Sequence, residues 1–212
     1  RHAKEHEPEA PVERGQRVRH RDGRIVLVGD EPERPYERLP LSKDVLRGEK
    51  DAETTRVHAE GYYDEHGIEL LTGRTVEALD LGAGQARLDG GETLGFTTAV
   101  LATGAAPRRL SLPGTDLDGV HYLRTRADSM RLGDAIRNGH RVAVIGAGWI
   151  GSEVAASARQ LGAEVVLIDP EPLPLRRVLG DEVGAMFRAL HADRGVDLRL
   201  GTGVILLRGR GE

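Results

Sequence analysis

The sequence predicts an α/β protein built around parallel sheets, and three observations carry this prediction. Residues 141 to 169 read as a strand, a glycine-rich turn, a helix and a second strand that ends in Asp169. Residues 25 to 28 form another apolar run, and a carboxylate, Asp30, follows it. The core is aliphatic, because 39% of the 212 residues are hydrophobic and only 3% are aromatic. Such a composition suits the Val-rich strands of parallel sheets.

Composition also excludes several classes of protein. A net charge of −4 provides no electrostatic basis for binding nucleic acid or an anionic membrane. No segment approaches ~18 consecutive apolar residues or resembles a signal peptide, so we expect a cytoplasmic protein. The chain has no cysteine, which excludes a redox disulfide, a catalytic thiol and a Cys-ligated iron–sulfur cluster within it.

Half of residues 1 to 24 are charged, and the segment has neither strand-like runs nor helical apolar periodicity, so we expect it to be disordered. His2, His6 and His20 lie in this segment. Only His2 and His6 have the i, i+4 spacing of one helix face, and no carboxylate pattern around them requires a metal. We therefore predict a solvated tail and no metal site.

Regular structure begins at the strand over residues 25 to 28. Pro32, Pro35 and Pro40 then impose a fixed loop that carries the cations Arg38 and Lys43 among others, and a short helix is expected from about residue 42. Further along we expect a helix over 58–66, strands over 68–71, 75–79, 85–88 and 99–102, and a turn over 90–95. The stretch 98–107 reads as a buried strand that runs into Thr103 and Gly104, where the backbone could approach a ligand closely.

The second half is expected to follow a linker over residues 107 to 119. Thr125 is a favourable N-cap for a helix over 125–137, which Asn138 and Gly139 stop. After the unit at 141–169, a proline-constrained loop over 170–178 is expected, followed by a helix over 181–194 and strands over 196–200 and 204–207.

The glycines of the turn have the spacing G-x-G-x-x-G at Gly146, Gly148 and Gly151. A lone match of this kind arises by chance roughly 0.5 times in a chain so rich in glycine, so the flanking strand, helix and Asp169 supply the specificity. In such a unit the glycines allow a tight turn, a close approach to a pyrophosphate and close helix packing. Asp169 would accept hydrogen bonds from the adenosine ribose, which favours NADH over NADPH, and no Arg or Lys follows until Arg176.

Four motifs in order give the chain a family resemblance. They are PYERLPLSK at 35–43, AVLATGAAPRRL at 99–110, HYLRTRADS at 121–129 and GAGWIGSEVAA at 146–156. Together they resemble the flavoprotein NADH-dependent ferredoxin reductases of the putidaredoxin and rhodocoxin reductase type. The resemblance implies a three-layer, Rossmann-like FAD/NAD(P)-binding fold, with a partial FAD-binding domain at 25–112 and an inserted NAD-binding βαβ domain at 113–212. It also implies electron transfer from NADH through FAD to a [2Fe–2S] ferredoxin that serves a cytochrome P450 or an oxygenase.

The resemblance also assigns residues to the cofactors. Asp30 would hold the FAD adenosine ribose, Lys43 would lie by the isoalloxazine and Val76 would contact the adenine side through its backbone. Arg124 would contact the FAD phosphates or ring edge, and Glu153 would lie near the nicotinamide, although an acid placed for the helix dipole explains it equally well. The full set of predicted cofactor-binding residues is Asp30, Arg38, Lys43, Val76, Thr103, Gly104, Arg124, Gly146, Gly148, Trp149, Ile150, Gly151, Glu153 and Asp169. No side chain is expected to act as a catalytic acid or base.

The chain also departs from the family pattern. Residues 1 to 24 have no G-x-G-x-x-G for the FAD pyrophosphate, the family continues past Glu212, and Leu39 stands where the family usually has proline. Three hypotheses therefore stay open: an incomplete FAD-dependent reductase, a non-catalytic NAD-binding remnant, and a relative that reduces nitrite components or oxygen. Disulfide reductases are disfavoured because they require cysteines.

Overall fold

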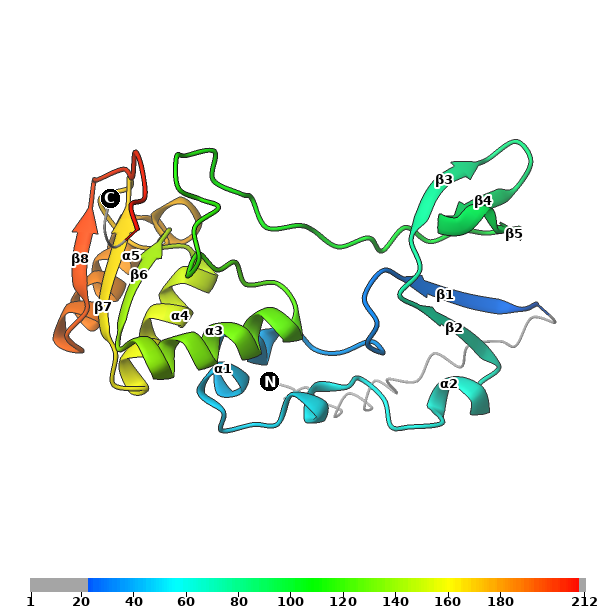
Figure 1. Ribbon diagram of the computed structural model, residues 1–212, viewed down its shortest axis with the longest axis horizontal. Helices are drawn as coiled ribbons and strands as arrows, with labels where there is room; N and C mark the ends of the chain where they lie inside the picture. Colours follow the sequence, from blue (N-terminus) through cyan, green and yellow to red (C-terminus); the bar gives the residue numbers. More distant parts are fainter. Residues whose placement is uncertain (1–22, 210–212) are drawn as a thin grey trace, which may run out of the picture.

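A computed structural model describes residues 23 to 209, which form three small sheets and the helices around them (Figure 1). The strands are β1 Ile25–Gly29, β2 Ile68–Thr72, β3 Val76–Asp80, β4 Gln85–Leu88, β5 Thr93–Gly95, β6 Arg141–Ile145, β7 Glu164–Asp169 and β8 Asp197–Leu200. The α-helices are α1 Asp44–Arg47, α2 Tyr62–Glu65, α3 Arg126–Gly139, α4 Trp149–Gln160 and α5 Arg176–Asp193, and short 3-10 helices span Leu39–Ser42, Ala52–Thr55 and Asp89–Gly91. The predictions for residues 1 to 22, including the solvated tail with His2, His6 and His20, lie outside the described residues.

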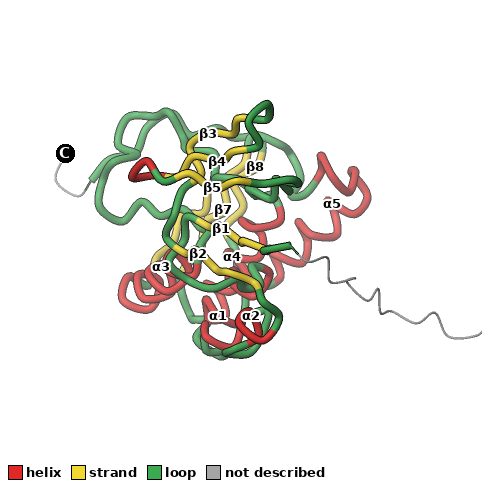
Figure 2. The backbone as a smooth tube through the Cα atoms, turned by 90° about the vertical axis from the view of Figure 1, so that its right-hand side faces the viewer, coloured by secondary structure: helices red, strands yellow, loops and turns green. Residues whose placement is uncertain are grey.

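Strands β6, β7 and β8 form a parallel sheet in that order, and β1 and β2 form a second parallel pair. The third sheet, β3–β4–β5, is antiparallel. In the turned view, α5 lies to one side of β7 and β8 and α3 to the other (Figure 2). The predicted α/β class with parallel sheets is therefore confirmed.

The strand, turn, helix and strand expected over residues 141 to 169 are present as β6, α4 and β7. Apolar side chains explain why α4 packs on the two strands, since Val165, Leu167, Ala155 and Ala158 are all buried in one cluster. Gly162 ends the α4 segment with a φ of +86°, as its position after the apolar periodicity predicts.

Helix α1 belongs to the same core although it lies about a hundred residues earlier in the chain. Leu46 is fully buried in the cluster that contains Ile136 and Val144. The Ser129 hydroxyl donates to the Leu41 carbonyl at 2.6 Å, and the Ser157 hydroxyl donates to the carbonyl of Ser42 at 2.7 Å. Part of the segment predicted as FAD-binding is thus packed directly on α3 and α4.

Helix α3 begins as predicted. The Thr125 side chain accepts a hydrogen bond from the Asp128 amide at 3.1 Å, and the Asp128 carboxylate accepts one from the Thr125 amide at 2.8 Å. This reciprocal capping box satisfies N–H groups that a helix end leaves without partners. Burial raises the pKa of Asp128, but the hydrogen bonds from Thr125 and Arg124 outweigh it and lower the pKa below its usual value.

Several expected elements are wrong. Only residues 62–65 of the predicted helix at 58–66 are helical, because Gly61 at φ +87° interrupts the chain just before them. The predicted turn at 90–95 contains strand β5, which pairs with β4. The buried strand expected over 98–107 is an extended, exposed segment, with Val100 85% and Leu101 73% exposed. Within residues 23 to 209 no strand pairs with that segment, and a strand is buried only when neighbours cover it.

The C-terminal boundaries also differ from the prediction. Helix α5 starts at Arg176, inside the expected loop, and Gly180 at φ +79° kinks it where the separate helix was expected to start. Residues 204–207 are not a strand, because the Leu207 amide donates to the carbonyl of Pro113 and not to a neighbouring strand. No helix in the described part of the chain is long and apolar enough to cross a membrane.

Candidate nucleotide-binding site

Each of the three glycines of the turn between β6 and α4 has its own structural role. Gly146 has a φ of +105°, which L side chains rarely adopt, and its amide donates to the Ile168 carbonyl at 2.8 Å. A Cβ on Gly151 would lie 1.8 Å from the carbonyl oxygen of Gly146, so only glycine allows α4 to pack this closely. A Cβ on Gly148 would meet nothing within 4 Å of the protein, which leaves the space beside it open. These properties are the ones that a dinucleotide-binding turn requires.

The first turn of α4 presents its backbone to this open space. Trp149 and Ile150 are the first two residues of the helix, and both side chains are about half exposed. The first N–H groups of a helix have no intrahelical acceptors, and the helix dipole adds a partial positive charge there. The turn can therefore bind an anion such as a pyrophosphate through its backbone.

Asp169 lies at the carboxyl end of β7, beside the same turn. One carboxylate oxygen accepts a hydrogen bond from the Ala147 amide at 2.6 Å, and the other accepts one from the Glu171 amide at 2.7 Å. The two bonds fix the carboxylate next to the glycine-rich turn and leave lone pairs free, because an ionised carboxylate can accept about four hydrogen bonds. From this position Asp169 can accept hydrogen bonds from ribose hydroxyl groups.

Lys43 and Glu153 form an ion pair between two segments of the chain that the sequence analysis assigns to different cofactors. The Lys43 ammonium lies 2.7 Å from the Glu153 carboxylate on α4, and the Ser42 hydroxyl donates to the same carboxylate. The Lys43 ammonium also donates to the Leu39 carbonyl at 3.1 Å. The structure therefore brings together the residue predicted beside the flavin and the residue predicted beside the nicotinamide.

Arg38 is held in a second polar cluster. It pairs with Glu31 and donates to the Tyr36 hydroxyl at 3.1 Å and to the Arg124 carbonyl at 2.8 Å. The Tyr36 hydroxyl donates to Glu31. Burial, together with this hydrogen bond to Glu31, raises the pKa of Tyr36 to about 12, so the phenol stays protonated as a donor at neutral pH.

The other residues predicted to bind flavin do not all lie close together. A Cβ on Gly104 would lie 3.0 Å from the guanidinium of Arg124, so the 103–104 segment and Arg124 are neighbours. Asp30 and Thr103 are exposed. Val76 starts β3, in the antiparallel sheet that Figure 1 shows at the opposite end of the molecule from β6–β8. The structure thus forms two groups. Lys43 lies with Glu153, and both Arg38 and Gly104 lie beside Arg124. Val76 belongs to neither group.

Sequence reasoning missed four residues of these clusters: Glu31, Tyr36, Ser42 and Glu171. Tyr36 and Ser42 lie inside the PYERLPLSK motif, which could have pointed to them. Glu31 is adjacent to Asp30, and a strand that ends before two acids does not show which of the two turns inward. Glu171 follows Asp169 by two residues, and only the fold shows that Arg176 and Arg177 turn back to pair with it.

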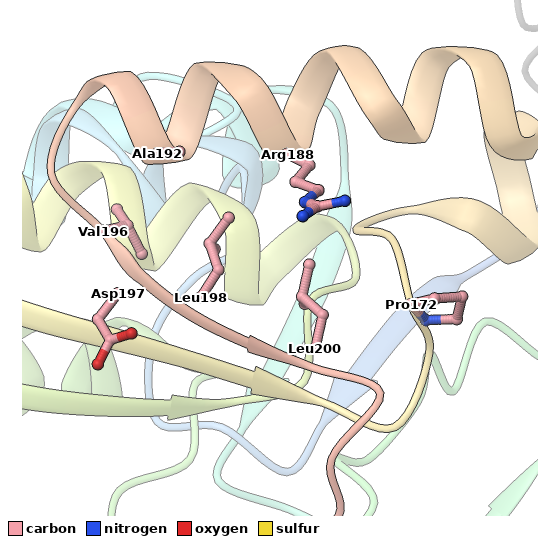
Figure 3. A pocket seen from close by; sticks show the side chains of 7 residues that line it. All are labelled: Pro172, Arg188, Ala192, Val196, Asp197, Leu198 and Leu200. Carbon is pink, nitrogen blue, oxygen red and sulfur yellow. The ribbon is translucent and has the colours of Figure 1, made fainter.

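A hollow of about 480 Å³ lies between α5 and β8, away from the glycine-rich turn (Figure 3). Its lining residues are Pro172, Arg188, Ala192, Val196, Asp197, Leu198 and Leu200. Figure 3 shows the side chains of Leu198 and Leu200 directed toward α5, and none of the lining residues belongs to the glycine-rich turn.

Comparisons with known proteins agree with this geometry. Residues 10–212 match the family model described as pyridine nucleotide-disulphide oxidoreductase. The chain is 40% identical to rhodocoxin reductase of Rhodococcus erythropolis over 182 residues, which cover 86% of this chain and 43% of that protein. It is 42% identical to the ferredoxin–NAD(+) reductase component of the anthranilate 1,2-dioxygenase system of Burkholderia cepacia over 186 residues, which cover 88% of this chain and 46% of that protein.

A solved structure extends the comparison to three dimensions. The covalent complex of putidaredoxin reductase with putidaredoxin matches with a TM-score of 0.83 and 35% identity, over 89% of this chain and 46% of the matched chain. The chain thus spans less than half the length of the relatives that it matches.

Proposed function

Because the chain belongs to the pyridine nucleotide-disulphide oxidoreductase family, we propose that it is part of a flavoprotein that transfers electrons from NADH through FAD to a ferredoxin. The observation that carries the proposal is the 2.7 Å pair between Lys43 and Glu153. This pair connects the segment assigned to the flavin with the helix that starts at the nucleotide-binding turn. One named relative is a rhodocoxin reductase, and the other is the ferredoxin–NAD(+) reductase component of a dioxygenase system.

NADH fits the residues of the turn. The helix packs closely on the turn because Gly151 has no side chain, and the space beside Gly148 is open. Together these features leave room for a pyrophosphate against the backbone of the turn. Asp169, already oriented by two backbone amides, would hold the adenosine ribose. The protein would thus bind and orient the dinucleotide chiefly through backbone groups, which carry no charge to titrate near neutral pH.

The ring end of FAD fits Lys43 and Arg124. When bound, the flavin would accept a hydride and release its electrons singly. Lys43 would place a positive charge beside the ring and so stabilise the negative charge of its reduced form. Glu153 and Ser42 would keep the Lys43 side chain in place. For the phosphate end, the glycine-rich strand–helix turn in the described residues is the one at 146–151, which we assign to NADH.

The partner that fits this chemistry is a [2Fe–2S] ferredoxin that passes electrons to a cytochrome P450 or another oxygenase. The chain contains no cysteine, so a thiol–disulfide exchange step within it is excluded. This part of the flavoprotein therefore offers no thiol to take up the electrons, which favours direct transfer from the flavin to an external acceptor. The relative named as a component of a dioxygenase system supports this acceptor class.

One alternative has a specific observation in its favour. The nucleotide turn is complete, whereas Asp30 and Thr103 on the flavin side are exposed and the 98–107 segment is not part of a sheet. This asymmetry favours an NAD-binding unit without turnover. The two functions differ in one observable, which is whether the chain binds flavin.

The test is a titration with two cofactors. The purified chain is incubated with FAD, freed of unbound flavin and examined by visible absorbance before and after addition of NADH. Bound flavin that bleaches with NADH supports the reductase, and Lys43→Met should then slow the bleaching more than Lys50→Met, which removes a cation outside the site. A colourless protein that binds NADH supports the binding unit, and a protein that binds neither cofactor contradicts both.

A further inference from the structure

A cluster of four charged residues follows Asp169 and has no role in the argument so far. The Glu171 carboxylate accepts two hydrogen bonds from Arg177, at 2.9 and 2.7 Å, and lies 3.4 Å from the Arg176 guanidinium. Arg176 also pairs with Asp181. The pairing with Arg177, followed by that with Arg176, lowers the pKa of Glu171 in spite of partial burial. Glu171 is therefore the shared counter-ion of two arginines.

Hydrogen bonds from the backbone connect this cluster to the candidate site. The Leu175 amide, directly before the two arginines, donates to the Ala147 carbonyl in the glycine-rich turn at 2.9 Å. Leu175 is buried in a left-handed conformation at φ +56°, which fixes the direction in which the chain enters α5. At the other end, the Glu171 amide donates to Asp169. The loop thus borders the position assigned to the adenosine ribose.

We propose that Glu171 is a specificity-determining residue, which makes the site prefer NADH to NADPH by occupying Arg176 and Arg177. This inference rests on the proposed nucleotide function of the turn. Arginine guanidinium groups bind phosphates well, and an arginine near the ribose is the feature that accommodates a 2′-phosphate in NADPH-binding sites. Here the two arginines are present, and internal carboxylates pair with them: Glu171 with both, and Asp181 with Arg176 as well.

Asp169 and Glu171 then have different tasks. Asp169 accepts hydrogen bonds from the ribose hydroxyls and repels a phosphate on the ribose. Glu171 adds a second negative charge and keeps the two guanidinium groups in ion pairs. Single exposed ion pairs are weak, about 0–1 kcal/mol. The Glu171 side chain is 25% exposed and pairs with both arginines, whereas Arg176 and Arg177 are 42% and 76% exposed. The effect of Glu171 should therefore be largest at low ionic strength.

The experiment compares the affinities of the full chain for NADH and NADPH. Trp149, the single tryptophan, begins α4 and provides a fluorescence signal for binding. Glu171→Gln keeps the shape of the side chain and removes its charge. We expect this variant to bind NADPH about tenfold more tightly than the parent at low ionic strength, with NADH affinity changed less than about twofold.

Two further variants make the result specific. Glu164→Gln removes the same charge at the opposite end of β7, where Glu164 pairs with Arg141, and should leave NADPH affinity unchanged. Adding Arg177→Met to Glu171→Gln should reverse most of the gain. If NADH binds but Glu171→Gln gains no more NADPH affinity than Glu164→Gln, the role of Glu171 is refuted while the proposed function stands. If the parent does not bind NADH, the proposed function fails, and this inference fails with it.

Discussion

At the scale of single residues, Gly148 and Gly151 lie three positions apart in one turn but are required for different reasons. Gly151→Ala would place a Cβ 1.8 Å from the Gly146 carbonyl oxygen. Because α4 must move to relieve this contact, we expect the free energy of unfolding to fall by about 1–3 kcal/mol and NADH binding to weaken. Both effects can be measured by urea unfolding and by NADH titration.

Gly148→Ala is the matched control. Its Cβ would meet no protein atom within 4 Å, and its φ of −75° suits an ordinary residue. We expect the free energy of unfolding to change by less than about 1 kcal/mol, whereas NADH affinity falls because the methyl group occupies the space left for the pyrophosphate. Equal stabilities for the Gly151→Ala variant and the parent protein would show that the close packing of α4 is not a constraint.

The residue scale also shows what sequence reasoning could provide. The turn at Gly146, Gly148 and Gly151 was predictable, because the conformational need and the spacing are both local. By contrast, the sequence did not show that Glu31, rather than Asp30, is the acid after β1 that turns inward to form an ion pair. Asp30 and Glu31 are adjacent and chemically alike, and the choice between them depends on Arg38 and Tyr36, which the loop brings back to Glu31.

At the scale of elements, the same division appears. The start of helix α3 and the β6–α4–β7 unit were predictable because a capping residue, glycines and apolar periodicity lie within them. The expected stop of α3 at Asn138 and Gly139 was wrong, since the helix includes both and ends before His140 at φ +57°. The predicted strands at 99–102 and 204–207 were not formed. An apolar run becomes a strand only when a neighbouring strand pairs with it, and this depends on residues far away in the sequence. In the described part of the chain no such neighbour pairs with either segment.

The last turn of α5 carries a testable pH dependence. His191 is 5% exposed, its Nε2 atom is buried without a hydrogen-bond partner, and burial lowers its pKa below the ordinary 6.5. Above pH 6.5 the ring is neutral in both the folded and the unfolded chain. Below it the unfolded chain binds a proton that the folded chain does not, so stability decreases as the pH falls.

The measurement is urea unfolding at several pH values between 7.5 and 5.5, carried out on the parent protein and on His191→Leu. The limit for one such proton is about 1.4 kcal/mol per pH unit. We expect the difference in free energy of unfolding between the two proteins to shift in favour of His191→Leu as the pH falls below 6.5. A difference that stays constant across this range would show that His191 titrates equally in both states.

At the scale of the whole molecule, the segment that carries Lys43 and the nucleotide unit share one core. Leu46 of α1 is fully buried beside Ile136 of α3 and Val144 of β6, and the Arg137 guanidinium donates to the Leu46 carbonyl at 3.3 Å. A Cβ on Gly133 would lie 2.7 Å from the same carbonyl, so glycine is required for this approach of α1 to α3. The position of Lys43 near Glu153 therefore depends on core packing.

Leu46→Ala tests this dependence. Removing a fully buried leucine side chain should lower the free energy of unfolding by about 2–5 kcal/mol. The loss should be visible in the urea midpoint of Trp149 fluorescence, although Trp149 lies in the nucleotide unit, more than a hundred residues from the substitution. Leu81→Ala, at a position that is 79% exposed, is the matched control and should leave that midpoint nearly unchanged. A Trp149 midpoint that Leu46→Ala does not shift would mean that the nucleotide unit unfolds independently of α1, and Lys43 would then be held to Glu153 by surface contacts alone.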